Sequence, residues 1–238
     1  MKNVLIIGAS SDLAIELAKI FASNGHNIVL ASRNIEKLKK TSIDIINKFS
    51  VECNFYEFDI NINEPHSLLN KLEKFPDILI STIGLNQKNQ FTVSDFELIL
   101  STNFLRLALF IEYFISQSEK NKLYSSILIT SSIAGIRGRA VNYIYGSAKS
   151  ALTEYLSGLR QKYNERLHIM TIIPGYIKTQ SLPKDISSKF LCISSKKMAN
   201  KIFKAFKYKR EIVYSPYWFI ISIILKMIPE QIFKKLKF

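Results

Sequence analysis

The chain has 238 residues, of which 47% are hydrophobic and 22% are charged, and its formal net charge is +14 at pH 7. This length suits one α/β domain, because strand and helix patterns alternate along it without an internal repeat or a Pro/Gly/Ser-rich linker. The basic excess indicates acidic partners. We do not expect nucleic acid among them, since the sequence contains neither zinc-finger spacing nor an RNA-recognition motif.

The few cysteines and histidines indicate a reducing location and no metal. Cys53 and Cys192 lie far apart, and no signal peptide precedes the first expected strand, which favours reduced thiols in the cytoplasm. His26, His66 and His168 have no ligand spacing among them, so we expect no metal site.

The first expected elements are a buried strand over Asn3–Ile7, a tight turn and an amphipathic helix from Asp12 to Asn24. This succession is typical of the opening of a dinucleotide-binding unit. Backbone N–H groups at the start of the helix would hold a pyrophosphate there, and the Asp12 carboxylate would cap some of them. We therefore expect cofactor contacts from Gly8, Ser10, Ser11, Asp12 and Leu13.

The end of the second expected strand indicates which nicotinamide cofactor is used. A protein that prefers NAD usually places a carboxylate there, but this chain has Ser32 and Arg33. A hydroxyl and a guanidinium suit a 2′-phosphate, so we predict a preference for NADP(H), with NAD(H) as the alternative. Arg33 is also consistent with an ordinary solvated residue after a strand.

A later strand and helix carry the residues most suited to catalysis. The strand over Ser126–Thr130 leads to Ser132, and Tyr145 and Lys149 share one face of a helix expected from Tyr143 to about Tyr163. A phenol with a pKa near ~10 is a poor acid at neutral pH unless a neighbouring ammonium lowers that pKa. A Tyr-x-x-x-Lys pair occurs roughly once by chance in this composition, so its place after a strand end is what favours catalysis.

At these residues the chain resembles the classical short-chain dehydrogenase/reductase family over nearly its whole length. The resemblance implies a single Rossmann-like, doubly wound parallel sheet with helices on both faces. It also implies a tetrad in which Ser132 and Tyr145 hold a ketone oxygen, Lys149 binds the nicotinamide ribose, and Asn103 fixes a water. The family's glycines at the positions of Asp12 and Ala14 are missing. Further cofactor contacts are implied for Asp59, Gly84, Pro174, Gly175, Ile177 and Thr179.

A closer resemblance links the active-site region and the C-terminus to bacterial decaprenylphosphoryl-2-keto-erythropentose reductases. It implies a keto-sugar carried on a polyprenyl phosphate, as in cell envelope biosynthesis. Arg137 and Arg139, between the catalytic Ser and Tyr, are candidates for binding a substrate phosphate, with a solvated surface loop as the other interpretation. The family also implies a homodimer or homotetramer formed through the helices that carry Asn103 and Tyr145.

We expect residues 1–215 to form the catalytic domain and residues 216–238 a basic, apolar tail. The segment Tyr217–Leu225 has nine uncharged residues, whereas a membrane-spanning helix needs about 20. It would lie in the membrane interface, with Tyr217 and Trp218 at headgroup depth. Packing on the sheet or across a dimer axis is the alternative. Basic residues that would face anionic lipids are Lys226, Lys234, Lys235 and Lys237.

Three functions are consistent with these patterns. The first is a reductase of a polyprenyl-linked keto-sugar, peripheral on the inner face of the cell membrane. The second is a reductase of a small soluble ketone or a 3-ketoacyl substrate, and the third is a non-catalytic NADP-binding partner. A loop from Gln180 to Ser195, after Pro174 and Gly175, is expected to contact the substrate.

Overall fold

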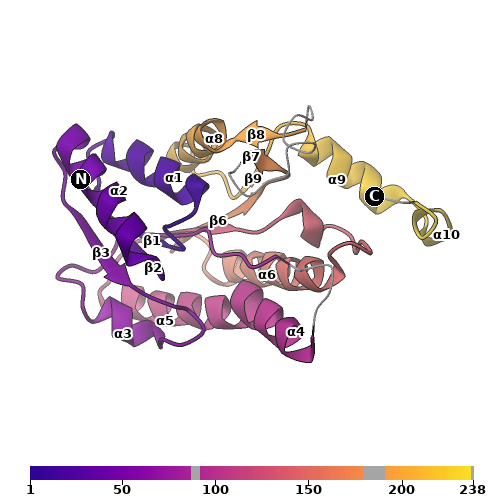
Figure 1. Cartoon of the computed structure of the whole chain (residues 1–238), viewed down its shortest axis with the longest axis horizontal. Helices are drawn as coiled ribbons and strands as arrows, with labels where there is room; N and C mark the ends of the chain where they lie inside the picture. The colour runs from indigo at the N-terminus through magenta and orange to yellow at the C-terminus, as the bar shows by residue number, and fades with distance from the viewer. Residues whose placement is uncertain (87–91, 179–190, 237–238) are drawn as a thin grey trace.

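The computed structural model describes residues 1–86, 92–178 and 191–236. Seven parallel strands form one sheet in the order β3-β2-β1-β4-β5-β6-β9 (Figure 1). The strand order reverses between β1 and β4, so the carboxyl ends of these two strands border a crevice where ligands bind in such sheets. The doubly wound fold is thereby confirmed. The strands are β1 (Asn3–Ile7), β2 (Asn27–Ser32), β3 (Cys53–Glu57), β4 (Ile78–Ser81), β5 (Ser126–Thr130), β6 (His168–Ile173) and β9 (Ile212–Tyr214).

Helices cover both faces of the sheet, and each face has its own hydrophobic core (Figure 1). Because side chains alternate along a strand, Val4 and Ile6 of β1 pack into one core and Leu5 and Ile7 into the other. The first core is covered by α1 (Asp12–Ala22), α2 (Ile35–Phe49) and α8 (Ser195–Lys207). The second is covered by α3 (Pro65–Leu69), α5 (Arg106–Lys120) and α6 (Tyr143–Lys162).

One helical run is longer than the others and has a long apolar stretch. It joins α4 (Val93–Leu100), a π-helical turn at Ser101–Leu105 and α5, and by length and composition it would be able to cross a membrane. Half of its apolar window is buried, and Phe110 and Phe114 of α5 lie in the core against the sheet. Packing on the sheet therefore accounts for much of its apolar character. Leu105 and Leu109, by contrast, are about half exposed.

The remaining elements lie toward the carboxyl end of the sheet. A short 3₁₀ turn, η2 (Ile133–Gly135), follows β5, and two short strands, β7 (Ile177–Lys178) and β8 (Ile193–Ser194), pair with each other. The chain ends in α9 (Trp218–Met227) and α10 (Glu230–Phe233), which form an arm extending from the body of the molecule (Figure 1).

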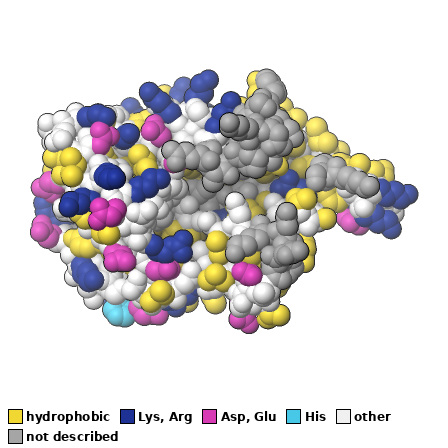
Figure 2. All heavy atoms as spheres, in the orientation of Figure 1, with side chains coloured by type: hydrophobic (Ala, Val, Ile, Leu, Met, Phe, Trp, Pro, Cys, Tyr) yellow, Lys and Arg dark blue, Asp and Glu magenta, His cyan; other side chains and the backbone are white. Residues whose placement is uncertain are grey.

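The two faces of α9 have different surroundings. Trp218 is only 5% exposed, whereas Phe219, Ile220 and Ile224 are more than half exposed. The expectation that Trp218 lies at headgroup depth is therefore wrong, because its indole is packed inside the fold. Figure 2 shows hydrophobic side chains along the arm and basic ones gathered at its tip.

Candidate active site

Two adjoining cavities of about 480 Å³ and 250 Å³ form a cleft at the carboxyl ends of the central strands. They share Ser11, Thr82, Ile83 and Gly84 in their walls. The larger cavity is also lined by predicted site residues, namely Asp12, Leu13, Ser132, Arg139, Tyr145, Lys149, Pro174, Gly175 and Ile177. The smaller one is lined by Gly8, Ser10, Ser32, Arg33 and Asp59. Thr179, most of the expected substrate loop and Lys237 lie outside the described residues.

The turn between β1 and α1 requires a glycine. Gly8 has φ +74°, and a Cβ there would lie 3.0 Å from the Ile83 side chain and backbone. Ser11 caps α1 by accepting a hydrogen bond from Ala14 N–H at 3.1 Å, so the cap is Ser11 and not the expected Asp12. Thr82 donates to the Gly8 carbonyl at 2.9 Å and also bonds the Ser11 hydroxyl. These hydrogen bonds join the end of β4 to the turn, and no local sequence pattern predicts them.

The carboxylate of Asp12, in the first turn of α1, has a cationic partner. Lys37 of α2 places its Nζ 3.7 Å from Asp12 Oδ1. A carboxylate at this position repels a pyrophosphate, and the Lys37 ammonium offsets part of that repulsion. The loss of a family glycine at Asp12 is thus compatible with an anion-binding turn.

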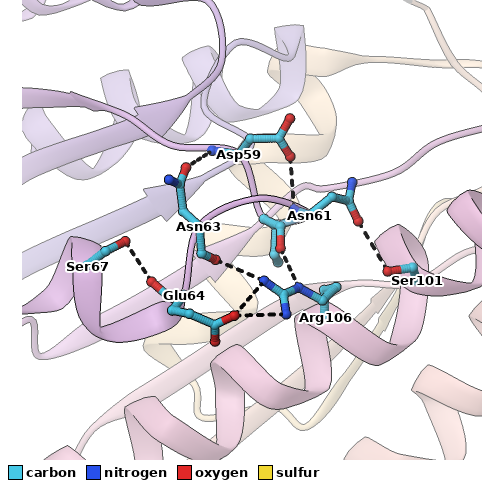
Figure 3. A network of polar contacts seen from close by, with 8 residues as sticks. Asp59, Asn61, Asn63, Glu64, Ser67, Ser101 and Arg106 are labelled. Carbon is cyan, nitrogen blue, oxygen red and sulfur yellow. Dashed lines mark hydrogen bonds and ion pairs between the residues drawn. The ribbon is translucent and has the colours of Figure 1, made fainter.

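The loop after β3 forms the far end of the smaller cavity, and a polar network holds it (Figure 3). Asp59 accepts from Asn61 N–H at 2.9 Å, and Arg106 of α5 donates to the Ile60 carbonyl at 2.8 Å and to Glu64. The Arg33 guanidinium is 74% exposed and lies 3.9 Å from Asp59. Such a long ion pair leaves Arg33 mostly in water at the mouth of the cavity.

Ser132 and Tyr145 meet in the larger cavity. Their hydroxyl groups form a hydrogen bond, and the Ser132 oxygen also accepts from Ala134 N–H at 3.1 Å. Burial raises the pKa of Tyr145, while the bond from Ser132 and the nearby Arg139 cation oppose that rise. The phenol is therefore neutral at physiological pH and retains a proton to donate.

Lys149 is 1% exposed and forms part of the floor of the larger cavity. Its ammonium donates to the carbonyls of Ile83 and Thr130, both at 3.0 Å, and sits 5.9 Å from the centre of the Tyr145 ring. Burial lowers the pKa of Lys149 to about 7. We expected Lys149 to depress the pKa of Tyr145, but in this arrangement the opposing influences on Tyr145 are Ser132 and Arg139.

Asn103 lies in the π-helical turn and is fully buried. Its amide donates to the carbonyls of Leu85 and Ile99 and accepts from Leu85 N–H at 3.1 Å. Asn103 thus holds the loop after β4, and a Cβ on Gly84 would lie 3.7 Å from its oxygen and 4.0 Å from Lys149 Nζ. The side chain is close to Lys149 but is already hydrogen-bonded to the backbone.

The two arginines between Ser132 and Tyr145 point to different places. Arg139 lines the larger cavity and acts on Tyr145. Arg137 instead donates to the Leu225 carbonyl at 2.6 Å, to the Ile228 carbonyl and to Glu230, and its guanidinium covers the Phe233 ring at 3.9 Å. In this arrangement Arg137 holds the end of α9, and only Arg139 faces the cleft.

Comparisons with known proteins agree with this geometry. The family model described as short chain dehydrogenase matches residues 2–189. The chain belongs to this family. It is 23% identical over 235 residues to hydroxysteroid 11-beta-dehydrogenase 1-like protein B of Xenopus laevis, covering 94% of this chain and 81% of that protein. It is 28% identical over 200 residues to the NADP-dependent 3-hydroxy acid dehydrogenase of Schizosaccharomyces pombe, covering 75% and 73%.

Solved structures extend the likeness of fold to the whole molecule. The short-chain dehydrogenase from Sphingobium yanoikuyae in complex with NADPH superposes with a TM-score of 0.81 at 17% identity. The alignment covers 100% of this chain and 97% of that one. The C-terminal arm is therefore included in the aligned region.

In this short-chain dehydrogenase the arm packs against a loop that lines the cleft. Trp218, at the start of α9, donates its indole N–H to the Leu191 carbonyl at 3.1 Å and packs edge-on against Tyr176. Gly175 N–H donates to the Ser215 hydroxyl at 2.8 Å. The arm thus supports the 174–176 loop through Trp218 and the 132–145 loop through the contacts of Arg137. Trp218 gave no functional signal in the sequence beyond its place in an apolar segment.

We expect Gly175→Ala to destabilise the protein and to slow turnover. A Cβ on Gly175 would fall 2.0 Å from the indole nitrogen of Trp218, so either the loop or the arm must move. Overpacking of this kind costs about 1–3 kcal/mol of unfolding free energy. Urea unfolding and ketone turnover measure the two effects.

The matched control is Gly158→Ala in α6, where a Cβ meets no atom within 4 Å and the extra helix propensity is neutral or favourable. Trp218→Leu should recover part of the stability lost in Gly175→Ala, giving a coupling of about 1 kcal/mol or more between the two sites. Purely additive effects would contradict the contact.

Proposed function

We propose that the protein reduces a ketone with NADPH in the larger cavity, and that Ser132 and Tyr145 hold the substrate oxygen. The observation that carries the proposal is the meeting of these two hydroxyls in one cavity, with the buried ammonium of Lys149 5.9 Å from the centre of the Tyr145 ring. A neutral Tyr145 donates its proton to the oxygen as negative charge develops there, and Ser132 donates a second hydrogen bond. Lys149 and Asn103 position the floor of the cavity.

The cleft has features that suit a phosphorylated dinucleotide. The Gly8 turn and the N-terminus of α1 would hold a pyrophosphate, and Asp59 closes the far end of the smaller cavity. When bound, the nicotinamide cofactor supplies the hydride. Ser32 and Arg33 would hold a 2′-phosphate, and the NADPH complex of the Sphingobium yanoikuyae protein supports this preference over NAD(H).

Arg33→Ala should raise the Kd for NADPH about 10- to 100-fold and leave the weaker binding of NADH nearly unchanged. The reason is the loss of a charge-assisted hydrogen bond that only the 2′-phosphate accepts. Such a bond contributes about 1.5–3 kcal/mol to the binding free energy. Fluorescence titration of both cofactors measures it. Arg166→Ala removes an exposed arginine paired with Glu119 far from the cleft and serves as the control. An equal loss for NADPH and NADH would refute the assignment.

For the substrate we propose a keto-sugar carried on a polyprenyl phosphate, a precursor of the cell envelope. Arg139 offers a guanidinium to the phosphate within the larger cavity, and Val141, Tyr176 and Ile177 offer apolar wall. The apolar face of α9 is exposed along the arm. Contact of the arm with the cytoplasmic face of an anionic membrane would bring the cleft to such a lipid-linked substrate.

The alternative substrate is a soluble 3-ketoacyl compound, which the likeness to the 3-hydroxy acid dehydrogenase favours. The two proposed substrates are separated by measuring NADPH oxidation with three compounds. These are a polyprenyl-phosphate keto-pentose, the same sugar without its lipid, and a 3-ketoacyl thioester. The proposal predicts turnover that is fastest with the lipid-linked sugar. Turnover of the thioester alone would overturn it in favour of the alternative.

We also propose that the protein forms a homodimer or homotetramer through α5 and α6. The half-exposed Leu105 and Leu109 on this side supply apolar surface for such a contact. Light scattering of the full chain tests it, and a monomer at working concentration would remove the proposal.

A further inference from the structure

A second cavity system lies outside the cleft, between α8, β9 and the start of α9. It has a volume of about 650 Å³, larger than either cavity of the cleft, and shares no lining residue with them. We call it the α8–α9 groove. Its basic wall consists of Lys201, Lys204 and Arg210, and its aromatic and apolar wall includes Tyr214, Phe219 and Ile220.

The three cations of the α8–α9 groove have no acidic partner among the ion pairs of the described residues. Burial, and the nearby Arg210 cation, lower the pKa of Lys201. Glu211, the acidic residue next to Arg210, acts on Arg160 and His168 instead. The groove therefore presents uncompensated positive charge, which an anion would neutralise.

The opposite wall is suited to an apolar chain. Tyr214 and Phe219 pack edge to face with ring centres 5.4 Å apart, and Phe219 and Ile220 are 56% and 60% exposed. The apolar surface continues along α9 through Ile223, Ile224 and Met227, which are 45–76% exposed. An anionic group and an apolar chain thus have adjacent binding surfaces.

A second copy of the chain fits this groove poorly. In a two-fold symmetric contact the same patch faces itself, so the three cations would oppose three others. An anionic bilayer complements both parts of the surface, because its phosphates attract the cations and its hydrocarbon accepts the apolar face of α9.

We propose that the α8–α9 groove binds the phosphate headgroup of an anionic membrane phospholipid while the exposed face of α9 enters the interface. The inference rests on the proposed membrane contact of the arm and is independent of the reductase activity. It places the binding determinants on Lys201 and Arg210, in addition to the lysines at the end of the arm.

The test is co-sedimentation of the full chain with phosphatidylcholine vesicles that contain or lack phosphatidylglycerol. Each basic residue at an anionic surface contributes about 1 kcal/mol, so Lys201→Gln with Arg210→Gln should weaken binding roughly 30-fold. The matched control is Lys39→Gln with Lys40→Gln on exposed positions of α2, which changes the net charge equally. It should retain nearly full binding.

Each other outcome is decisive. If both double variants lost vesicle binding to the same extent, only the net charge of the protein would matter, and the proposed lipid site in the groove would be overturned. If the groove variant bound vesicles as well as the wild-type protein, the proposed lipid site in the groove would be overturned and the membrane contact of the arm would stand. If the full chain bound no vesicles, both proposals would be removed. If inorganic phosphate bound the groove as strongly as the vesicles do, the occupant would be free phosphate. If the groove variant had a changed oligomeric state, the occupant would be a second copy of the chain. NADPH-dependent turnover of a soluble ketone, measured in parallel, is expected to stay unchanged.

Discussion

Tyr145→Phe should lower kcat at least about a thousandfold while leaving NADPH affinity within a factor of two or so, as expected for loss of a general acid. Burial raises the pKa of the phenol, so at neutral pH it holds the proton that the substrate oxygen needs. Phenylalanine keeps the ring and its packing but has no proton to give and no hydrogen bond to Ser132. Single-turnover kinetics and a fluorescence titration of NADPH measure the two quantities separately.

Tyr143→Phe is the matched control, because Tyr143 lies on the same helix two residues earlier and is 47% exposed. It should keep wild-type turnover. If Tyr145→Phe were as active as this control, Tyr145 would not be the proton donor. If it lost NADPH binding to the same extent as turnover, its role would be in holding the cofactor.

Lys149→Met should abolish a pH dependence of stability as well as most of the activity. The folded pKa of about 7 lies below the ordinary value of 10.5, so between these values the unfolded chain binds more protons than the folded chain. The free energy of unfolding therefore rises with pH across that window, by up to about 1.4 kcal/mol per pH unit. From pH 7 to pH 9 the wild-type protein should gain about 2 kcal/mol more than the variant.

Urea unfolding at the two pH values measures this difference, and subtracting the variant removes the contributions of all other groups. Lys197→Met on the exposed side of α8 is the control and should show the wild-type slope. Equal slopes for Lys149→Met and the wild-type protein would mean that the carbonyls of Ile83 and Thr130 stabilise the ammonium enough to restore its pKa.

Much of the cleft was predictable from sequence because its parts are local. The strands over Asn3–Ile7 and Ser126–Thr130 are buried on both faces, so they appear as continuous apolar runs with sharp ends. In a parallel sheet those ends meet at one edge, which brings the residues after them together. The four-residue spacing of Tyr145 and Lys149 on one helix is equally local.

The contacts that escaped prediction join residues distant in the chain. Arg137 binds carbonyls 88 and 91 residues later, and Trp218 packs on Gly175 and Leu191. Nothing in a local pattern distinguishes an arginine that faces a cleft from one that caps a helix end. The same holds for Trp218, whose apolar neighbours on α9 are exposed while its own side chain is buried.

Trp218 is the only tryptophan of the chain, and its burial against Gly175 makes it a spectroscopic probe. All indole emission comes from one known place, directly against the loop at Gly175 that lines the cleft and is expected to contact the cofactor. Reduced nicotinamide absorbs in the range where indole emits, so bound NADPH should quench this emission by energy transfer. A shift of the emission to longer wavelength would instead report that the arm has left this loop. Unlabelled protein therefore reports both cofactor occupancy and release of the arm.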